Sequence, residues 1–504
     1  MVEVLAKIIA KRSQDIATKG LDFGHTIPQN RIHPLIPPKL DKPLIITEIK
    51  RASPSAGHIG DIHSVTHLAQ SYLNGGASAI SVLCEERHFN GSLRDLMQVK
   101  AAYPNACVLR KDFIQDSQEI EISYRAGADM VLLIAAMFID EKDGFLQLQK
   151  IYEKCLSFGI TPLLEVHNQR EIDFITPLKP ALVGVNSRNL HTFEIDIPSA
   201  CVLRQSLQDS LPASKVIFES GIDSASSGFM VGSLGFNGLL CGSYLVAHKN
   251  PTHAIQSLKK AFELGFTQKP RFYNDVFHKW HREKILVKIC GITSLDDALQ
   301  IGELGTYGGV DMLGFILAKN SPRFIESKQI QNIAKALQKL YPHILRIAVV
   351  NDKHSLNTAK ILYKEGYIDG IQLHSLNPQT PKMYANTSLE EALYCYYVAQ
   401  NVENLEDFSK EYAGAFCLID SKSVQGGGSG KSVAKDVLLS LKELYLCVAG
   451  GINPQNLQEF LALKPSLLDI NSGVEKSAGL KDIALVKKIF NILESSPITH
   501  KQKK

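Results

Sequence analysis

Carboxylates and lysines in the first half of the chain stand directly after short apolar runs. Lys111 occurs in Leu-Arg-Lys-Asp, Glu165 in Leu-Leu-Glu-Val-His, and Glu219 in Phe-Glu-Ser-Gly, while Glu48 and Lys50 share Thr-Glu-Ile-Lys. One charged residue at a strand end is usually only a solvated edge. Three carboxylates and two lysines at one rim would shift one another's pKa values, as acid–base catalysis requires.

Two short glycine-bearing segments follow the last two apolar runs of this half. They are Ser220-Gly221 and Gly242-Ser243. Backbone N–H groups at such turns commonly bind phosphate in α/β barrels. The segments therefore predict a phosphorylated substrate.

A cysteine occupies the corresponding rim position in the second half. Cys290 lies in Lys-Ile-Cys-Gly-Ile-Thr, just before an expected helix start. A lone cysteine in an apolar strand is more often a buried small hydrophobe. A helix N-terminus and the nearby Lys288 would, however, lower the pKa of the thiol. With Asp420, after the sixth run, Cys290 could move a proton between adjacent carbons.

An arginine and three glycine clusters accompany this pair. The fork of Arg323, in Ser-Pro-Arg-Phe, suits a substrate carboxylate. The clusters at 426–430, 450–451 and 471–475 would let backbone N–H groups approach a phosphate. Gly430-Lys431-Ser432 resembles the end of a nucleotide P-loop, but Gln425 stands where its first glycine is required, so we do not expect ATP binding.

Elements that would place these residues at a rim are eight short apolar runs in each half, most of them separated by segments long enough for a helix. In the first half they are Leu44–Ile49, Ala79–Leu83, Ala106–Leu109, Met130–Ala135, Pro162–Leu164, Ala181–Val185, Val216–Phe218 and Gly238–Cys241. In the second half they are Leu286–Ile289, Met312–Leu317, Arg346–Val350, Gly370–Leu373, Cys395–Ala399, Ala415–Ile419, Leu446–Ala449 and Leu468–Ile470. The Tyr-rich run at Cys395 could equally be a helix end.

This alternation predicts an α/β protein of two tandem (β/α)8 TIM barrels. A doubly wound sheet would carry its glycine-rich turn after the first strand, and neither half does. We expect barrels at 1–265 and 285–497, a linker at 266–284, partly helical and containing the only tryptophan, and a basic tail at 498–504. Val4, Leu5, Ile8 and Ile9 have helical spacing and predict a helical extension before the first barrel.

Composition narrows the function further. A net charge of +4 over 504 residues is too small to indicate nucleic-acid binding, and the apolar run 131–139 is too short to span a membrane. Nine cysteines without a CxxC pair, and no HExxH, support neither a zinc site nor a disulfide framework. We expect a cytoplasmic, monomeric protein without a metal or organic cofactor.

The first-half motifs resemble the indole-3-glycerol-phosphate synthase family over about residues 1–262. The resemblance implies ring closure of an anthranilate-bearing ribulose phosphate with loss of CO₂ and water. Lys111 would be the general acid and Glu165 its acid–base partner, with Glu48 and Glu219 tuning them. The remaining family positions would bind substrate: Asn186 and Arg188 its hydroxyls and carboxylate; Lys50, Ser220, Gly221, Gly242 and Ser243 the phosphate; Ser53, Phe89 and Phe113 the aromatic ring.

The second-half motifs resemble the phosphoribosylanthranilate isomerase family over about residues 285–495. The resemblance implies an aminoaldose-to-aminoketose rearrangement with Cys290 as base and Asp420 as acid. Arg323 would hold the anthranilate carboxylate. The other family positions are Gly427, Gly428, Gly450, Gly451, Ser472 and Gly473 for phosphate, and Gln372, His374 and Asp469 as support. Asn471 replaces the usual serine and should keep the backbone contacts.

The two implied reactions are consecutive, since the isomerase product is the synthase substrate. Both use small phosphorylated anthranilate compounds. One alternative is a tandem-barrel protein in which one barrel is catalytically silent and only senses phosphate or acts as a scaffold. Another is a sugar-phosphate isomerase of histidine synthesis, which would use paired aspartates in place of the cysteine.

Overall fold

The chain divides into two compact units, Met1–Lys269 and Pro270–Lys504. The computed structural model describes residues 3–54, 57–189, 194–282, 284–304, 309–374, 394–408, 416–421, 435–440 and 445–496. The expected basic tail and the glycines Gly427 and Gly428 lie outside these ranges. No helix in the described ranges is long and apolar enough to cross a membrane.

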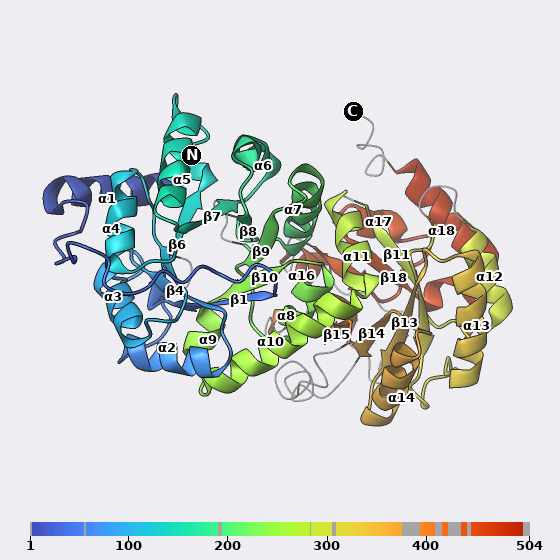
Figure 1. Ribbon diagram of the computed structural model, residues 1–504. Coiled ribbons are helices and arrows are strands. Elements are labelled where there is room, and N and C mark those ends of the chain that lie inside the picture. The colour runs from blue at the N-terminus through green and yellow to red at the C-terminus, as the bar shows by residue number, and fades with distance from the viewer. Residues whose placement is uncertain are drawn as a thin grey trace. The chain divides into compact units, whose positions relative to one another are not determined.

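Eight parallel strands close the first barrel in the order β1-β10-β9-β8-β7-β6-β5-β4, which confirms the predicted architecture (Figure 1). The strands are β1 (Leu44–Ile49), β4 (Ala79–Leu83), β5 (Val108–Lys111), β6 (Met130–Ile134), β7 (Thr161–Val166), β8 (Leu182–Asn186), β9 (Lys215–Glu219) and β10 (Gly238–Cys241). A small hairpin, β2 (Ala52–Ser53) with β3 (Gly57–His58), follows β1. Most strand side chains are buried, because a parallel barrel is covered by helices outside and filled by side chains inside.

Helices alternate with these strands and lie outside them. They are α2 (Val65–Asn74), α3 (Leu93–Ala102), α4 (Gln118–Ala126), α5 (Gly144–Ser157), α6 (Gln169–Ile175), α7 (Ile197–Ser210), α8 (Ala225–Ser233), α9 (Ser243–Ala247) and α10 (Pro251–Gln268), with short 3₁₀ turns η1 (Ala135–Met137) and η2 (Thr176–Leu178). Several begin at a side-chain cap: Ser64 accepts a hydrogen bond from the backbone N–H of His67, and Asn168 one from that of Glu171.

The predicted N-terminal extension is confirmed as α1 (Glu3–Lys19). Leu5 and Ile8 are buried. Arg12 is buried too, and its guanidinium binds Asp112, 3.0 Å away, and Glu119, 2.5 Å away. These ion pairs fix α1 to Asp112, next to Lys111, and to the first turn of α4. Removing one partner would leave an uncompensated buried charge.

The second barrel is also closed, in the order β11-β12-β13-β14-β15-β16-β17-β18. Its strands are β11 (Leu286–Ile289), β12 (Met312–Ile316), β13 (Leu345–Val350), β14 (Gly370–His374), β15 (Tyr396–Val402), β16 (Cys417–Ser421), β17 (Cys447–Ala449) and β18 (Leu467–Ile470). The Tyr-rich run is therefore a strand. Its other elements are α12 (Leu295–Glu303), α13 (Ser327–Leu340), α14 (Lys353–Lys364), η3 (Leu405–Asp407), α16 (Lys435–Ser440), α17 (Leu457–Leu461), η5 (Ser472–Val474), the hairpin β19 (Glu475–Ser477) with β20 (Leu480–Lys481), and α18 (Ile483–Ser495).

Most of the expected linker 266–284 has a defined structure. α10 continues to Gln268, and α11 (Arg271–His281) belongs to the second unit. Phe272 stacks on Tyr397, and the Trp280 indole N–H donates to the Ser466 carbonyl at 2.9 Å. Because Ser466 directly precedes β18, α11 packs at the N-terminal ends of the strands, opposite the expected site. It is therefore an integral part of this barrel.

Candidate active sites

The C-terminal mouth of the first barrel contains a cavity of about 590 Å³. All fourteen residues predicted for this site line it: Glu48, Lys50, Ser53, Phe89, Lys111, Phe113, Glu165, Asn186, Arg188, Glu219, Ser220, Gly221, Gly242 and Ser243. Val4, Leu5 and Ile8 of α1 line it as well. The structure thus places residues from seven strand ends and the N-terminal helix around one space.

Lys111 lies between two carboxylates in this cavity. Its ammonium donates to Glu219 Oε2 at 2.6 Å and to Glu165 Oε2 at 3.4 Å. Burial alone would lower the pKa of Lys111, but Glu219, Glu165 and Glu48 outweigh it and raise the pKa above its usual range. Lys111 is therefore a charged donor held over the centre of the barrel.

The environments of the two carboxylates drive their pKa values apart. Burial and the neighbouring Glu165 raise the pKa of Glu219 to about 7, although Lys111 opposes this rise. Burial also acts on Glu165, but Lys111 and His167 outweigh it and hold its pKa well below the usual range. Two carboxylates with separated pKa values can serve different acid–base roles.

Gly242, directly after β10, makes room for an acidic side chain of the neighbouring strand β1. A Cβ on Gly242 would lie 2.6 Å from Glu48 Oε1, which is ion-paired to Lys50 at 2.7 Å. Ser220 and Gly221 have left-handed φ angles of 70° and 75°. Such a φ is strained for serine, and strained backbone often lies at ligand-binding turns.

An apolar surface completes the first cavity. The Phe89 and Phe113 rings lie 6.0 Å apart, and Leu83, Leu132 and Ile134 also line the cavity. An aromatic ring fits beside such side chains, while the charged groups contact the polar part of the same molecule.

The mouth of the second barrel holds a cavity of about 540 Å³. Nine of the predicted residues line it: Cys290, Arg323, Gln372, His374, Asp420, Gly450, Gly451, Asp469 and Ser472. Gly473 is not among the residues that line it. A Cβ on Gly473 would lie 2.0 Å from the Ile452 carbonyl oxygen, so this glycine permits close packing of two loops.

Burial dominates the chemistry of the expected acid–base pair. It raises the pKa of Cys290, although Lys288 opposes it, so the expectation of a lowered thiol pKa is wrong in its net direction. Burial also raises the pKa of Asp420, whose Oδ2 lies 3.7 Å from His374 Nε2. A raised pKa makes a carboxyl group better able to hold a proton, which suits a general acid.

A polar cluster lies beside Cys290. Lys288 is fully buried; its ammonium donates to Asp469 Oδ2 at 2.7 Å and also to Gln372 Oε1. The Tyr397 hydroxyl donates to the same Gln372 oxygen at 2.8 Å. These bonds fix the side chains of Gln372 and Asp469 at the base of the cavity.

The guanidinium of Arg323 is oriented by an acidic residue that our sequence analysis did not single out. Its Nε and Nη2 donate to the Glu475 carboxylate at 3.0 and 2.8 Å. Lys481 donates to Glu475 Oε1 at 2.8 Å. Glu475 ends the Ser-Gly-Val-Glu motif, but nothing in the sequence indicates that it pairs with Arg323.

Comparisons with known proteins divide the chain at the same place. Residues 5–258 match the family model for indole-3-glycerol phosphate synthase, and residues 287–492 match that for N-(5'-phosphoribosyl)anthranilate (PRA) isomerase. The tryptophan biosynthesis protein TrpCF of Helicobacter pylori is 30% identical over 455 residues, covering 90% of each chain. The chain belongs to the TrpCF family.

Other relatives are either similar in length to this chain or longer. The protein from Haemophilus influenzae is 27% identical and covers 97% of this chain and 96% of its own. The multifunctional tryptophan biosynthesis protein of Phycomyces blakesleeanus is 28% identical over 89% of this chain, which spans 62% of that longer relative. The first barrel is the synthase barrel and the second is the isomerase barrel.

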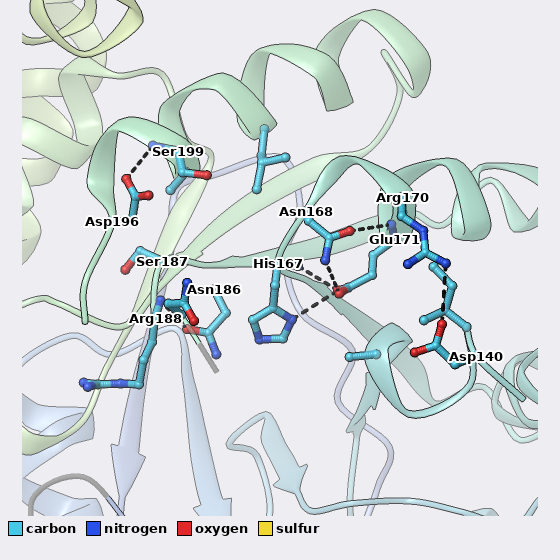
Figure 2. Close-up of a pocket in the computed structure, with 15 residues that line it drawn as sticks. Asp140, His167, Asn168, Arg170, Glu171, Asn186, Ser187, Arg188, Asp196 and Ser199 are labelled. Carbon is cyan, nitrogen blue, oxygen red and sulfur yellow. Dashed lines mark hydrogen bonds and ion pairs between the residues drawn. The ribbon is translucent and has the colours of Figure 1, made fainter. Parts of the chain in front are cut away.

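A second pair in the synthase barrel was also missed. His167 follows β7, and its Nδ1 lies 3.1 Å from Glu171 Oε2, in the first turn of α6 (Figure 2). Its Nε2 lies 3.3 Å from Glu165 Oε1. The alternation of a strand, which places residues 165 and 167 on one face, was the available signal.

Proposed function

We propose that this protein catalyses two consecutive steps of tryptophan biosynthesis. The isomerase barrel would convert N-(5-phosphoribosyl)anthranilate to 1-(2-carboxyphenylamino)-1-deoxyribulose 5-phosphate. The synthase barrel would convert that product to indole-3-glycerol phosphate. The position of Lys111 between Glu165 and Glu219, beside an apolar wall, is the observation that carries the proposal.

Ring closure would begin at the carbonyl carbon of the ribulose chain. The aromatic carbon that bears the carboxylate attacks it, and the carbonyl oxygen takes a proton from Lys111, which avoids a free alkoxide. The Phe89 and Phe113 wall would favour loss of CO₂, because an apolar slot stabilises the neutral product better than the carboxylate. The bonding electrons return to the ring as CO₂ leaves.

Loss of water would complete the indole. The new hydroxyl needs a proton in order to leave, and the CH2 carbon beside the ring nitrogen gives up a proton as the double bond forms, while the nitrogen keeps its own. We assign this exchange to Glu165, which faces Lys111 in the same cavity. Glu48 and Glu219 would hold the charge balance, and the turns at Ser220 and Gly242 would bind the phosphate.

In the isomerase barrel, Asp420 would protonate the ribose ring oxygen, which opens the sugar to an iminium ion. Cys290 would then remove the proton from the adjacent carbon to give the enamine that becomes the ketone. The raised pKa of Asp420 supports its role as the acid. Arg323 would hold the anthranilate carboxylate through the Nη1 side of its guanidinium, because Nε and Nη2 are bound to Glu475.

One assay tests the whole proposal. The purified protein is incubated with N-(5-phosphoribosyl)anthranilate, and indole-3-glycerol phosphate is measured over time. We expect the ribulose intermediate to appear first and the indole product to follow. Accumulation of the intermediate alone would show a silent synthase barrel, and no change in the substrate would show a silent isomerase barrel.

A further inference from the structure

His167 lies between Glu165 and a second cavity of the synthase barrel, and Asn186 and Arg188 line both this cavity and the substrate cavity. On one side it faces Glu165, which lines the substrate cavity. On the other it lines a side cavity of about 410 Å³, together with Asp140, Asn168, Glu171 and other residues (Figure 2). The His167 side chain itself is only 8% exposed. The ring thus stands between the catalytic carboxylate and a second space.

Both ring nitrogens of His167 face carboxylates. Nε2 lies at ion-pair distance, 3.3 Å, from Glu165 Oε1 without a hydrogen bond between them, and Nδ1 is hydrogen-bonded to Glu171 Oε2 at 3.1 Å. Glu171 is fixed in turn by the His167 backbone N–H at 2.8 Å and by the Asn168 amide at 2.6 Å. A neutral imidazole with an ionised Glu165 would leave one nitrogen lone pair facing a carboxylate. A proton on Nε2 removes this repulsion, so the arrangement favours a protonated ring beside an ionised Glu165.

The proposed synthase reaction consumes a proton. The substrate carboxylate is charged, but the carbon leaves as neutral CO₂, and the other products are water and a neutral indole ring. One proton must therefore enter the site in each turnover. It has to reach a cavity filled by substrate and covered in part by α1.

We propose that His167 relays this proton to Glu165 from the side cavity. The proton on Nε2 passes to Glu165 Oε1 and from there to the leaving hydroxyl. The neutral ring stays hydrogen-bonded to Glu171 through Nδ1 and regains a proton from the side cavity before the next turnover. This inference rests on the proposed synthase activity.

The surrounding charges are consistent with a ring that is protonated at rest. Burial lowers the pKa of His167, but Glu165 and Glu171 outweigh it and raise the pKa to about 10. Lys111 lies beyond Glu165, while Arg188, Asp140 and Arg170 line the side cavity. Only the two glutamates are within ion-pair distance of the ring in the described structure.

Two substitutions at His167 distinguish a proton relay from a purely structural role, in which the side chain only holds the loop before α6 in place. His167→Gln keeps a polar side chain that cannot carry a proton, and His167→Ala leaves space next to the side cavity for added imidazole. Arg170→Gln is the matched control, because Arg170 lines the same cavity but is exposed and pairs with Asp140 only at 3.5 Å. Isomerase activity in the same chain reports the integrity of each preparation.

For His167→Gln we expect synthase kcat to fall about 10²-fold, the scale of acid–base catalysis, with KM within about twofold of the parent. The solvent deuterium isotope effect on kcat should increase, because proton delivery becomes rate-limiting. The acidic limb of kcat/KM should move to higher pH, because Glu165 loses a cation that lowers its pKa. Added imidazole should restore turnover of His167→Ala in proportion to its concentration.

Normal kcat in His167→Gln would overturn the relay. The relay would also be overturned if added imidazole did not restore synthase activity in His167→Ala while the isomerase stayed active. That result is expected if His167 has only a structural role. Wild-type protein that makes no indole-3-glycerol phosphate would contradict the proposed function instead. The failure of the relay and of the proposed function can therefore be distinguished.

Discussion

Glu219 Oε1 occupies the space directly above Gly184: a Cβ on residue 184 would lie 2.0 Å from that oxygen. Gly184 belongs to β8 and Glu219 to β9, and the two strands are neighbours in the synthase barrel. Gly184 therefore leaves the space that Glu219 needs in order to reach Lys111, although Gly184 itself has no side chain that could contact Lys111.

Gly184→Ala should disable the synthase. The methyl group would displace the Glu219 carboxylate from Lys111, and an error of about 1 Å in a catalytic group can cost roughly 10²-fold in rate. We expect synthase kcat to fall by at least about 10-fold while isomerase kcat is unchanged. Steady-state kinetics of both activities on one preparation measure this. Unchanged synthase turnover would show that the position of Glu219 is not critical.

Glu475→Gln should weaken substrate binding in the isomerase barrel. The amide cannot hold the Arg323 fork as the carboxylate does, and Lys481 loses its charged partner. We expect isomerase KM to rise by about 10-fold, corresponding to about 1.4 kcal/mol of binding free energy. Synthase activity of the same protein serves as the control. A fall in kcat at constant KM would assign Glu475 to chemistry and not to orientation.

Mixing two variants tests the independence of the sites. Cys290→Ala should lack only the isomerase, and Lys111→Ala should lose at least about 10²-fold of synthase activity alone. Neither should convert N-(5-phosphoribosyl)anthranilate to indole-3-glycerol phosphate at a normal rate. An equimolar mixture should do so after a lag, while the intermediate accumulates in solution.

An inactive mixture of otherwise competent variants would mean that the intermediate does not pass through solution. Variants that each lack both activities would contradict the assignment of one site to each barrel.

Cutting the chain at two different positions should show where the second domain begins. We propose that a cut between Lys269 and Pro270 gives two soluble, active fragments. A cut between Lys284 and Ile285 should yield an aggregating second fragment, because it removes α11 and the buried Phe272, Val276, Phe277 and Trp280. Their burial contributes roughly 6–12 kcal/mol, comparable with the whole stability of a domain. Expression and gel filtration of both pairs measure the difference.

Barrel architecture and most lining residues were accessible from sequence, because buried parallel strands read as apolar runs and their C-terminal ends meet at one rim. The runs at Leu44 and Gly238 match β1 and β10 in full, whereas Ala106–Leu109 is shifted by two residues from β5. Charge pairing was less accessible. Arg323 and Glu475 are separated by 152 positions, and only folding brings them together.

Net pKa directions also required the structure. Lys288 next to Cys290 suggested a lowered thiol pKa, but the closed packing of the barrel makes burial the larger effect. α11 was obscured for a related reason. The face of α11 that packs against the second barrel is apolar. The sequence pattern shows such a face but does not show which barrel it packs against.

Trp280 gives this protein a built-in optical probe of one half. It is the only tryptophan of the chain, it is 4% exposed, and its indole lies among Phe277, Phe416 and Tyr445. Selectively excited indole emission will therefore report the packing of the isomerase barrel, while the synthase barrel stays dark. A shift of that emission during denaturation reports the unfolding of the isomerase barrel alone, whereas far-ultraviolet circular dichroism reports the unfolding of both barrels.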